Sequence, residues 1–182
     1  MNLELDAFSS GQIKSKLWAA EKLEWCVEEH DTGPLDIYIL GGWYSLLYFI
    51  LKIRNNISIK TCRSFDLDPS ACSVANLINN TWETEEWAFR SFPKDINQLD
   101  YPLNVNCVIN TITEHIKGKD WYDRIPNGTL CLFQSNDLEH KDHVNKVSSI
   151  EELQEKFPLS KIYYSGQKHI DTYTRYMIIG KK

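Results

Sequence analysis

The stretch from residue 35 to residue 55, LDIYILGGWYSLLYFILKIRN, is the part of the sequence that most constrains the fold. It reads as a buried strand over residues 36–40, then two glycines, then an apolar helix over residues 43–52. Gly41 and Gly42 allow a tight turn and place no side chain between the backbone and a ligand. A helix that begins there presents backbone N–H groups to an anionic or polar group. A tight turn without a ligand is the alternative, because two glycines alone are weak evidence for a binding loop.

Strands and helices alternate along the rest of the chain. This alternation predicts an α/β fold with right-handed crossovers and a parallel sheet covered on both faces. The last two strands are about eight residues apart, which is short enough for an antiparallel hairpin. The predicted strands are 36–40, 57–65, 86–90, 105–110, 129–134, 161–165 and 173–180, and the predicted helices are one that begins near Gly11, then 43–52, 70–78, 117–123 and 149–156.

The composition is that of a soluble globular protein. A chain of 182 residues with 42% hydrophobic content suits a single domain over residues 1–182. The net charge of −5 argues against a general nucleic-acid binder. No apolar run reaches the roughly 20 residues of a membrane helix, and residues 1–16 do not have the pattern of a secretory signal. Five widely spaced cysteines without a CxxC pair indicate reduced thiols, so we expect a cytoplasmic protein with no membrane partner.

Acidic side chains follow the second predicted strand, in the segment SFDLDPSA. Asp66 lies more than about 20 residues after the glycine turn, where Rossmann-like proteins bind ribose hydroxyls. Asp68 precedes Pro69, and this pair is typical of a helix N-cap followed by proline at the first helical position. We therefore assign ligand binding to Asp66 and helix capping to Asp68.

A polar cluster follows the strand predicted at 105–110, in the segment NTITEH. Within it, Asn110 ends the strand, and either Glu114 or His115 is a candidate general base, since the ordinary pKa of histidine lies near neutrality. Loops after parallel strands often carry functional residues. The alternative is that Thr113 or Glu114 caps the next helix and His115 packs on the surface.

Two further polar segments lie downstream. Residues 134–137 (QSND) follow the next strand, so they either reach the same cleft or form a polar turn. His140 and His143, in LEHKDH, are three residues apart, a spacing that can hold a metal ion on a helix. A solvated, charged turn explains this segment more simply, so no metal site is expected.

These features together resemble class I S-adenosylmethionine-dependent methyltransferases. The resemblance rests on the order of an N-terminal helix, the GG turn, FDLDP, KDI, the strand VNCVINT and a closing hairpin. It implies a Rossmann-like, doubly wound, mostly parallel seven-stranded sheet whose last strand is antiparallel, with S-adenosylmethionine across the ends of the first four strands. At the matching positions it implies Gly41 and Gly42 in the cofactor loop, Asp66 on the ribose, Asp95 at the adenine amino group, and Asn110 beside the transferred methyl.

The sequence departs from this family at two places. Tyr38 replaces the acidic or small residue that usually precedes the loop, and Trp43 stands where a second glycine is expected, so Trp43 either packs over the cofactor or caps the helix sterically. The segments SSGQIKSKLW, LGGWY, NTITEH and LFQSND resemble small methyltransferase-like proteins carried by bacteriophages. In this fold class an N-terminal helical segment, here residues 1–30 with Gln12, Lys14 and Lys16, often lies over the mouth of the active site.

The sequence thus predicts a methyltransferase that acts on a small molecule or a protein side chain. A methyl sulfonium is already an activated electrophile, so the protein mainly has to align the nucleophile and sometimes remove its proton. The acidic charge and the missing Asn/Asp-Pro-Pro-aromatic motif argue against a nucleic-acid acceptor. The main alternative is a binding protein that retains the fold without catalysis. A nicotinamide-dependent oxidoreductase is disfavoured, because the full GxGxxG is missing.

Overall fold

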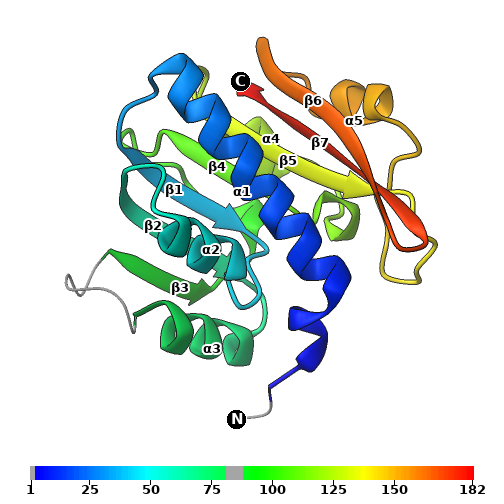
Figure 1. The fold of residues 1–182 in the computed structure, drawn as a ribbon, viewed down its shortest axis with the longest axis horizontal. Coiled ribbons are helices and arrows are strands. Elements are labelled where there is room, and N and C mark those ends of the chain that lie inside the picture. Colours follow the sequence, from blue (N-terminus) through cyan, green and yellow to red (C-terminus); the bar gives the residue numbers. More distant parts are fainter. Residues whose placement is uncertain (1–2, 81–87) are drawn as a thin grey trace.

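The computed structural model describes residues 3–80 and 88–182, and its centre is a seven-stranded sheet with the strand order β3-β2-β1-β4-β5-β7-β6 (Figure 1). Strands β1 to β5 pair in parallel, whereas β7 is antiparallel to both of its neighbours, β5 and β6. The strands are β1 (Leu35–Leu40), β2 (Ile59–Asp66), β3 (Phe89–Pro93), β4 (Cys107–Asn110), β5 (Leu130–Asn136), β6 (Lys161–Ile170) and β7 (Tyr173–Lys181).

This topology confirms the predicted fold class. The sheet is mostly parallel, and its last strand is antiparallel and closes a hairpin with β6. The hairpin does not simply extend the edge, because β7 inserts between β5 and β6. The strand predicted at 86–90 is found at Phe89–Pro93, and residues 86 and 87 of that prediction lie outside the described residues.

Helices cover both faces of the sheet, with α1 and α2 in front and α4 and α5 behind in Figure 1. The front face forms one apolar core that includes Leu23, Ile37 and Leu47. The back face forms a second core around Trp121 and Phe133. The helices are α1 (Ser10–His30), α2 (Leu46–Arg54), α3 (Pro69–Asn80), α4 (Asp120–Asp123) and α5 (Ile150–Lys156), with the 3₁₀ helices η1 (Leu5–Phe8), η2 (Ile96–Gln98) and η3 (Thr113–His115).

The central strands are buried along their whole length. All four residues of β4 and all seven of β5 are buried, which is the pattern of parallel strands covered on both faces. The last three residues of β5 are nevertheless polar: Gln134, Ser135 and Asn136. The alternative of a polar turn beginning at residue 134 is therefore wrong, and these polar groups are carried into the interior at the carboxyl end of the sheet.

Helix α2 begins at Leu46 and not at residue 43 as expected. Gly41, Trp43 and Ser45 have φ angles of 64°, 48° and 53°, which lie in the left-handed region. Such angles are incompatible with a right-handed helix, so the chain makes three left-handed steps before the helix forms. The glycine turn is longer than the sequence predicted.

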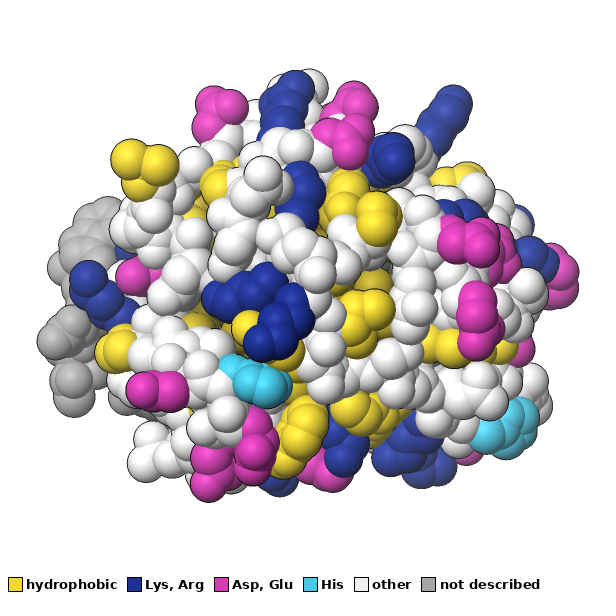
Figure 2. All heavy atoms as spheres, turned by 90° about the horizontal axis from the view of Figure 1, so that it is seen from above, with side chains coloured by type: hydrophobic (Ala, Val, Ile, Leu, Met, Phe, Trp, Pro, Cys, Tyr) yellow, Lys and Arg dark blue, Asp and Glu magenta, His cyan; other side chains and the backbone are white. Residues whose placement is uncertain are grey.

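Other expectations concern the whole chain. All five cysteines are free and buried, which agrees with reduced thiols. Within the described residues, no helix combines the length and the apolar character needed to cross a membrane. On the face shown in Figure 2, acidic and basic side chains both occur across the described surface.

Candidate functional site

Three adjoining pockets lie at the carboxyl ends of the parallel strands. The strand-end pocket, of about 370 Å³, is lined by the ends of β1 and β2, by η2 and by the segment from Ile112 to Lys117. The glycine-loop pocket, of about 610 Å³, lies between the turn after β1 and the start of α1. The hairpin pocket, of about 470 Å³, lies between the start of α1, η3, the end of β5 and the turn between β6 and β7.

The structure brings most of the predicted site residues to these pockets. Gly41 and Asp66 border both the strand-end pocket and the glycine-loop pocket, and Asp95 borders the strand-end pocket. Gly42 and Trp43 border the glycine-loop pocket. His115 borders all three pockets, and Glu114 borders the hairpin pocket.

The two glycines are required by close packing. A Cβ atom on Gly41 would lie 2.1 Å from Cδ1 of Ile112, and one on Gly42 would lie 1.9 Å from Oγ of Ser64. The backbone N–H of Gly42 donates to the carbonyl of Phe65 at 3.0 Å. The expectation that N–H groups of this turn face a ligand therefore fails for the N–H of Gly42, which is used within the fold.

Asp66 connects the glycine turn to β2. Its Oδ2 accepts the backbone N–H of Trp43 at 2.8 Å, and its Oδ1 accepts the N–H of Asp68 at 3.1 Å. An ionised carboxylate has about four acceptor positions, so both oxygens can accept further hydrogen bonds from a ligand. Asp68 accepts the N–H of Ser70 at 2.8 Å at the start of α3, and the predicted cap with Pro69 as the first helical residue is confirmed.

Asp95 and its neighbours form one wall of the strand-end pocket. The Asp95 carboxylate accepts the N–H of Asn97 at 2.9 Å and thereby caps η2. The same pocket is lined by the apolar side chains of Ile96, Ile112 and Ile116. An acidic group beside apolar walls suits a flat ring that carries a hydrogen-bond donor.

Asn110 shapes the turn after β4. It is fully buried, and its Oδ1 accepts the N–H of Ile112 at 3.0 Å. This bond fixes the turn that holds the Ile112 side chain over Gly41. Asn110 is not among the described residues that line the three pockets.

Glu114 is buried, with 1% of its surface exposed, beside a buried arginine. Its Oε1 accepts hydrogen bonds from Asn136 and, at 3.3 Å, from Nη2 of Arg175. Arg175 also donates from Nη1 to the carbonyl of Thr111 at 2.8 Å. The alternative that Thr113 or Glu114 caps the following helix is wrong, because the Thr113 hydroxyl donates to the carbonyl of Gln134 and α4 has no side-chain cap.

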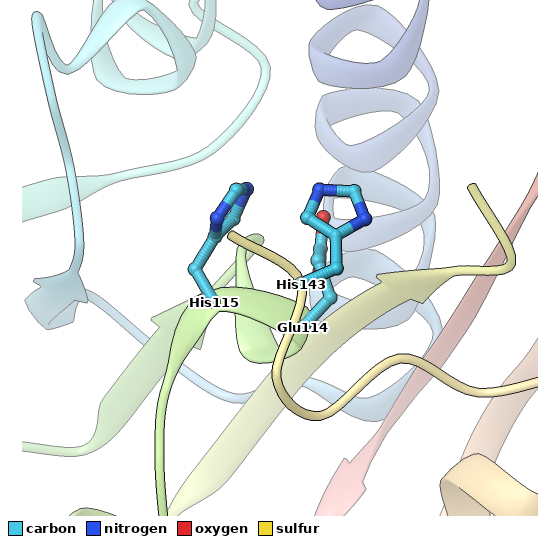
Figure 3. A group of neighbouring side chains, drawn as sticks. All are labelled: Glu114, His115 and His143. Carbon is cyan, nitrogen blue, oxygen red and sulfur yellow. The ribbon is translucent and has the colours of Figure 1, made fainter. Parts of the chain in front are cut away.

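His115 extends from η3 toward the loop after β5 (Figure 3). Its ring lies edge-on to the ring of His143, with centroids 4.5 Å apart. His115 is exposed, in agreement with the alternative of a surface histidine. Partial desolvation of its ring lowers the pKa of His115 below its usual value, although the nearby carboxylate of Glu114 acts in the opposite direction. His140 and Asp142 lie in a turn, as expected, with 3.6 Å between Nδ1 and a carboxylate oxygen.

Lys16 enters the glycine-loop pocket from α1. Its Nζ donates to Oε1 of Gln12 at 2.6 Å, and no carboxylate among the described residues pairs with it. Burial, aided by the positive charge of Arg175, lowers the pKa of Lys16 to about 7. Sequence reasoning placed the N-terminal segment near the site, but the partial burial of one lysine out of several cannot be read from spacing.

Solved structures share this arrangement of strands. The magnesium protoporphyrin IX methyltransferase of Synechocystis PCC 6803, solved with bound S-adenosylmethionine, matches with a TM-score of 0.67 and 10% identity over 94% of this chain and 81% of that chain. The chain has the class I methyltransferase fold. NodS of Bradyrhizobium japonicum WM9, an N-methyltransferase in complex with S-adenosylhomocysteine, matches with a TM-score of 0.67 and 11% identity over 97% and 90% of the two chains.

A third match is the geranyl diphosphate C-methyltransferase of Streptomyces coelicolor A3(2), with a TM-score of 0.63 and 9% identity over 88% of this chain and 77% of that chain. No protein-family model matches the chain, and no curated protein matches it in sequence. Similarity at this identity shows the fold alone, so the activity has to be argued from the site.

Proposed function

We propose that this chain is an S-adenosylmethionine-dependent methyltransferase that acts on a small molecule or a protein side chain. The observation that carries the proposal is the convergence of Gly41, Asp66 and Asp95 on adjoining pockets at the carboxyl ends of β1, β2 and β3. Ligands of doubly wound sheets bind at this edge. When bound, S-adenosylmethionine supplies a methyl group on a sulfonium, which is already activated for transfer.

The residues of the site fit the three parts of this cofactor. Asp95 and the apolar side chains of Ile96 and Ile112 suit the adenine ring, with the carboxylate at the adenine amino group. Asp66, between the two pockets, suits the ribose hydroxyls. Lys16, a half-buried lysine that forms no ion pair with a carboxylate among the described residues, suits the carboxylate of the methionine part. Removing a charge from water is costly unless it is paired, so a partly desolvated ammonium group favours a bound carboxylate.

The glycine turn serves this site by its shape. Gly41 has no side chain where the two cofactor pockets meet, and Trp43 borders the glycine-loop pocket with its ring 5.2 Å from that of Tyr44. We assign Trp43 to packing against the methionine part. Asn110 acts indirectly, by holding the turn that positions Ile112.

The hairpin pocket is the proposed site of the acceptor. Its lining is largely polar and includes Gln12 from the N-terminal segment, so residues 1–30 contribute to the mouth of the proposed active site. His115 borders this pocket and both cofactor pockets, which supports a role for it between the cofactor and the acceptor. Glu114 is held by Arg175 and Asn136, so we assign contact with the acceptor to His115 and a positioning role to Glu114.

Two measurements test the proposal. Calorimetry should show binding of S-adenosylhomocysteine and no binding of NAD. Incubation with methyl-labelled S-adenosylmethionine and a cell extract should label an acceptor, and the resemblance to bacteriophage proteins makes a bacterial host extract the first choice. Absence of S-adenosylhomocysteine binding would refute the proposed function.

A binding protein that retains the fold is the second candidate. It is favoured by Trp43, a bulky residue in the left-handed region where the family has a glycine. This candidate gains support if the cofactor binds but no extract becomes labelled.

A further inference from the structure

Three potential metal ligands converge in the hairpin pocket. Glu114 and His115 come from η3, and His143 comes from the loop after β5 (Figure 3). One ligand atom from each residue lies within 4.8 Å of the other two. His143 is almost thirty positions from the adjacent Glu114 and His115 in the sequence, so the fold brings it to them.

The carboxylate of Glu114 has one oxygen left over. Oε1 accepts from Asn136 and Arg175, whereas Oε2 is buried and has no hydrogen-bond partner in the described part of the chain. A buried carboxylate oxygen without a partner is costly, because desolvation removes its water and nothing replaces it. An ion bound by this oxygen would remove that cost.

The imidazole of His143 is oriented in the way expected of a metal ligand. Its Nδ1 lies 2.8 Å from the carbonyl oxygen of Leu138. A carbonyl only accepts, so Nδ1 carries the proton and Nε2 has a free lone pair. Metal-binding histidines usually donate their second N–H to a carbonyl or carboxylate in this way.

We propose that Glu114, His115 and His143 bind a divalent transition-metal ion of the Zn²⁺ class. Two imidazoles and one carboxylate form a ligand set that leaves a fourth position open for water or substrate. With metal–ligand bonds of about 2.1 Å, the three groups must approach each other by roughly 1 Å, through rotation of the side chains. The site discriminates against Mg²⁺ and Ca²⁺, which need several oxygen ligands, and the charge of Arg175 opposes ions held mainly by electrostatic attraction.

The use of the ion depends on the proposed function, but its binding does not. In the hairpin pocket, the ion's open position would take an oxygen, nitrogen or sulfur atom of the acceptor. Coordination lowers the pKa of such an atom, so its proton passes to water before the methyl group arrives. His115 would then act on the acceptor through the metal.

The test is metal titration of the full chain after dialysis against a chelator. We expect calorimetry with ZnCl₂ to show binding of one ion per chain, and CoCl₂ to give the visible absorption of a low-symmetry site. Since even an outer partner of a metal ligand is worth about 10- to 100-fold in affinity, His143→Ala should weaken Zn²⁺ binding by more than about 100-fold. Glu114→Gln should do the same, and excess Mg²⁺ should not displace the ion.

His140→Ala is the matched control, because it removes an imidazole from the same turn and leaves the three ligands in place. It should bind Zn²⁺ within a few-fold of the parent. Circular dichroism and melting establish that each variant is folded. Glu114→Gln leaves Arg175 without its ion pair and can unfold for that reason. In that case His143→Ala, whose residue lies in an irregular loop, still tests the metal site. Failure of the parent to bind Zn²⁺, or an equal loss in His140→Ala and His143→Ala, overturns the proposal. S-adenosylhomocysteine binding in the same samples shows whether the metal site fails alone or the proposed function fails with it.

Discussion

Asp66→Ala tests the proposed cofactor site most directly. The Asp66 carboxylate borders both cofactor pockets and has room to accept two ribose hydroxyls. Hydrogen bonds to a charged acceptor are worth about 1.5–3 kcal/mol, so removing them should weaken S-adenosylhomocysteine binding by roughly 10- to 150-fold. The same substitution removes the acceptor for the N–H groups of Trp43 and Asp68, which should lower the free energy of unfolding by about 1–3 kcal/mol.

Asp68→Asn is the matched control, because it removes a negative charge two residues away, at the edge of the glycine-loop pocket. Asparagine still caps a helix, so stability and affinity should both change little. The assay is calorimetric titration with S-adenosylhomocysteine, after urea unfolding followed by circular dichroism has shown that each variant is folded. A folded Asp66→Ala that binds like the parent, or an Asp68→Asn that loses as much affinity, would refute the assignment of the ribose site.

Three other substitutions probe the remainder of the site. Gly42→Val should lower the free energy of unfolding, measured in urea, by about 1–3 kcal/mol, because the new Cβ clashes with Ser64. The folded variant should no longer bind S-adenosylhomocysteine, and normal binding would show that the loop is only a turn. In the parent protein, the affinity for S-adenosylhomocysteine should fall as the pH rises through about 7, because Lys16 then loses the proton that gives it the charge to pair with the ligand carboxylate. Calorimetry between pH 6 and 8 should show a flatter dependence in Lys16→Met. His115→Ala should slow methyl transfer by about 10²–10⁴-fold in the labelling assay, while its affinity for S-adenosylhomocysteine stays within a few-fold of the parent value. An unchanged rate would show that His115 takes no part in the chemistry.

The fold could be read from the sequence because its signals are local. The apolar segments ending at Leu40 and Asn110 are buried on both faces, and uninterrupted apolar strands between helices indicate a covered parallel sheet. The Asp68-Pro69 pair identified the start of α3. Such features depend only on neighbours in the chain, so pattern and cap chemistry suffice to find them.

The conformation of the glycine turn could not be read in the same way. Trp43 and Ser45 adopt left-handed backbone angles, which residue preferences strongly disfavour for a tryptophan. The cost is offset by contacts that only the fold provides, namely the bond from the Trp43 N–H to Asp66 and the bond between the Ser45 and Ser64 hydroxyls at 2.7 Å. Apolar periodicity therefore placed the start of the helix too early.

The environment of Glu114 could not be predicted from the sequence either. Its position after a buried strand marked it as a functional candidate, but its burial depends on partners far along the chain. The same holds for His143, whose ring contacts both its sequence neighbour His140 and the distant His115. Spacing within LEHKDH therefore gave no indication of the three-residue cluster.

The antiparallel strand β7 explains how these partners are assembled. In the pairing of β5 with β7, Arg175 lies directly opposite Asn136, and both side chains donate to Oε1 of Glu114. Because β7 inserts beside β5, Arg175 near the start of β7 reaches the end of β4 and fixes the orientation of the Glu114 carboxylate. The second oxygen of that carboxylate, Oε2, is left without a hydrogen-bond partner among the described residues. The strand that distinguishes this sheet from a fully parallel one thus organises the proposed acceptor site.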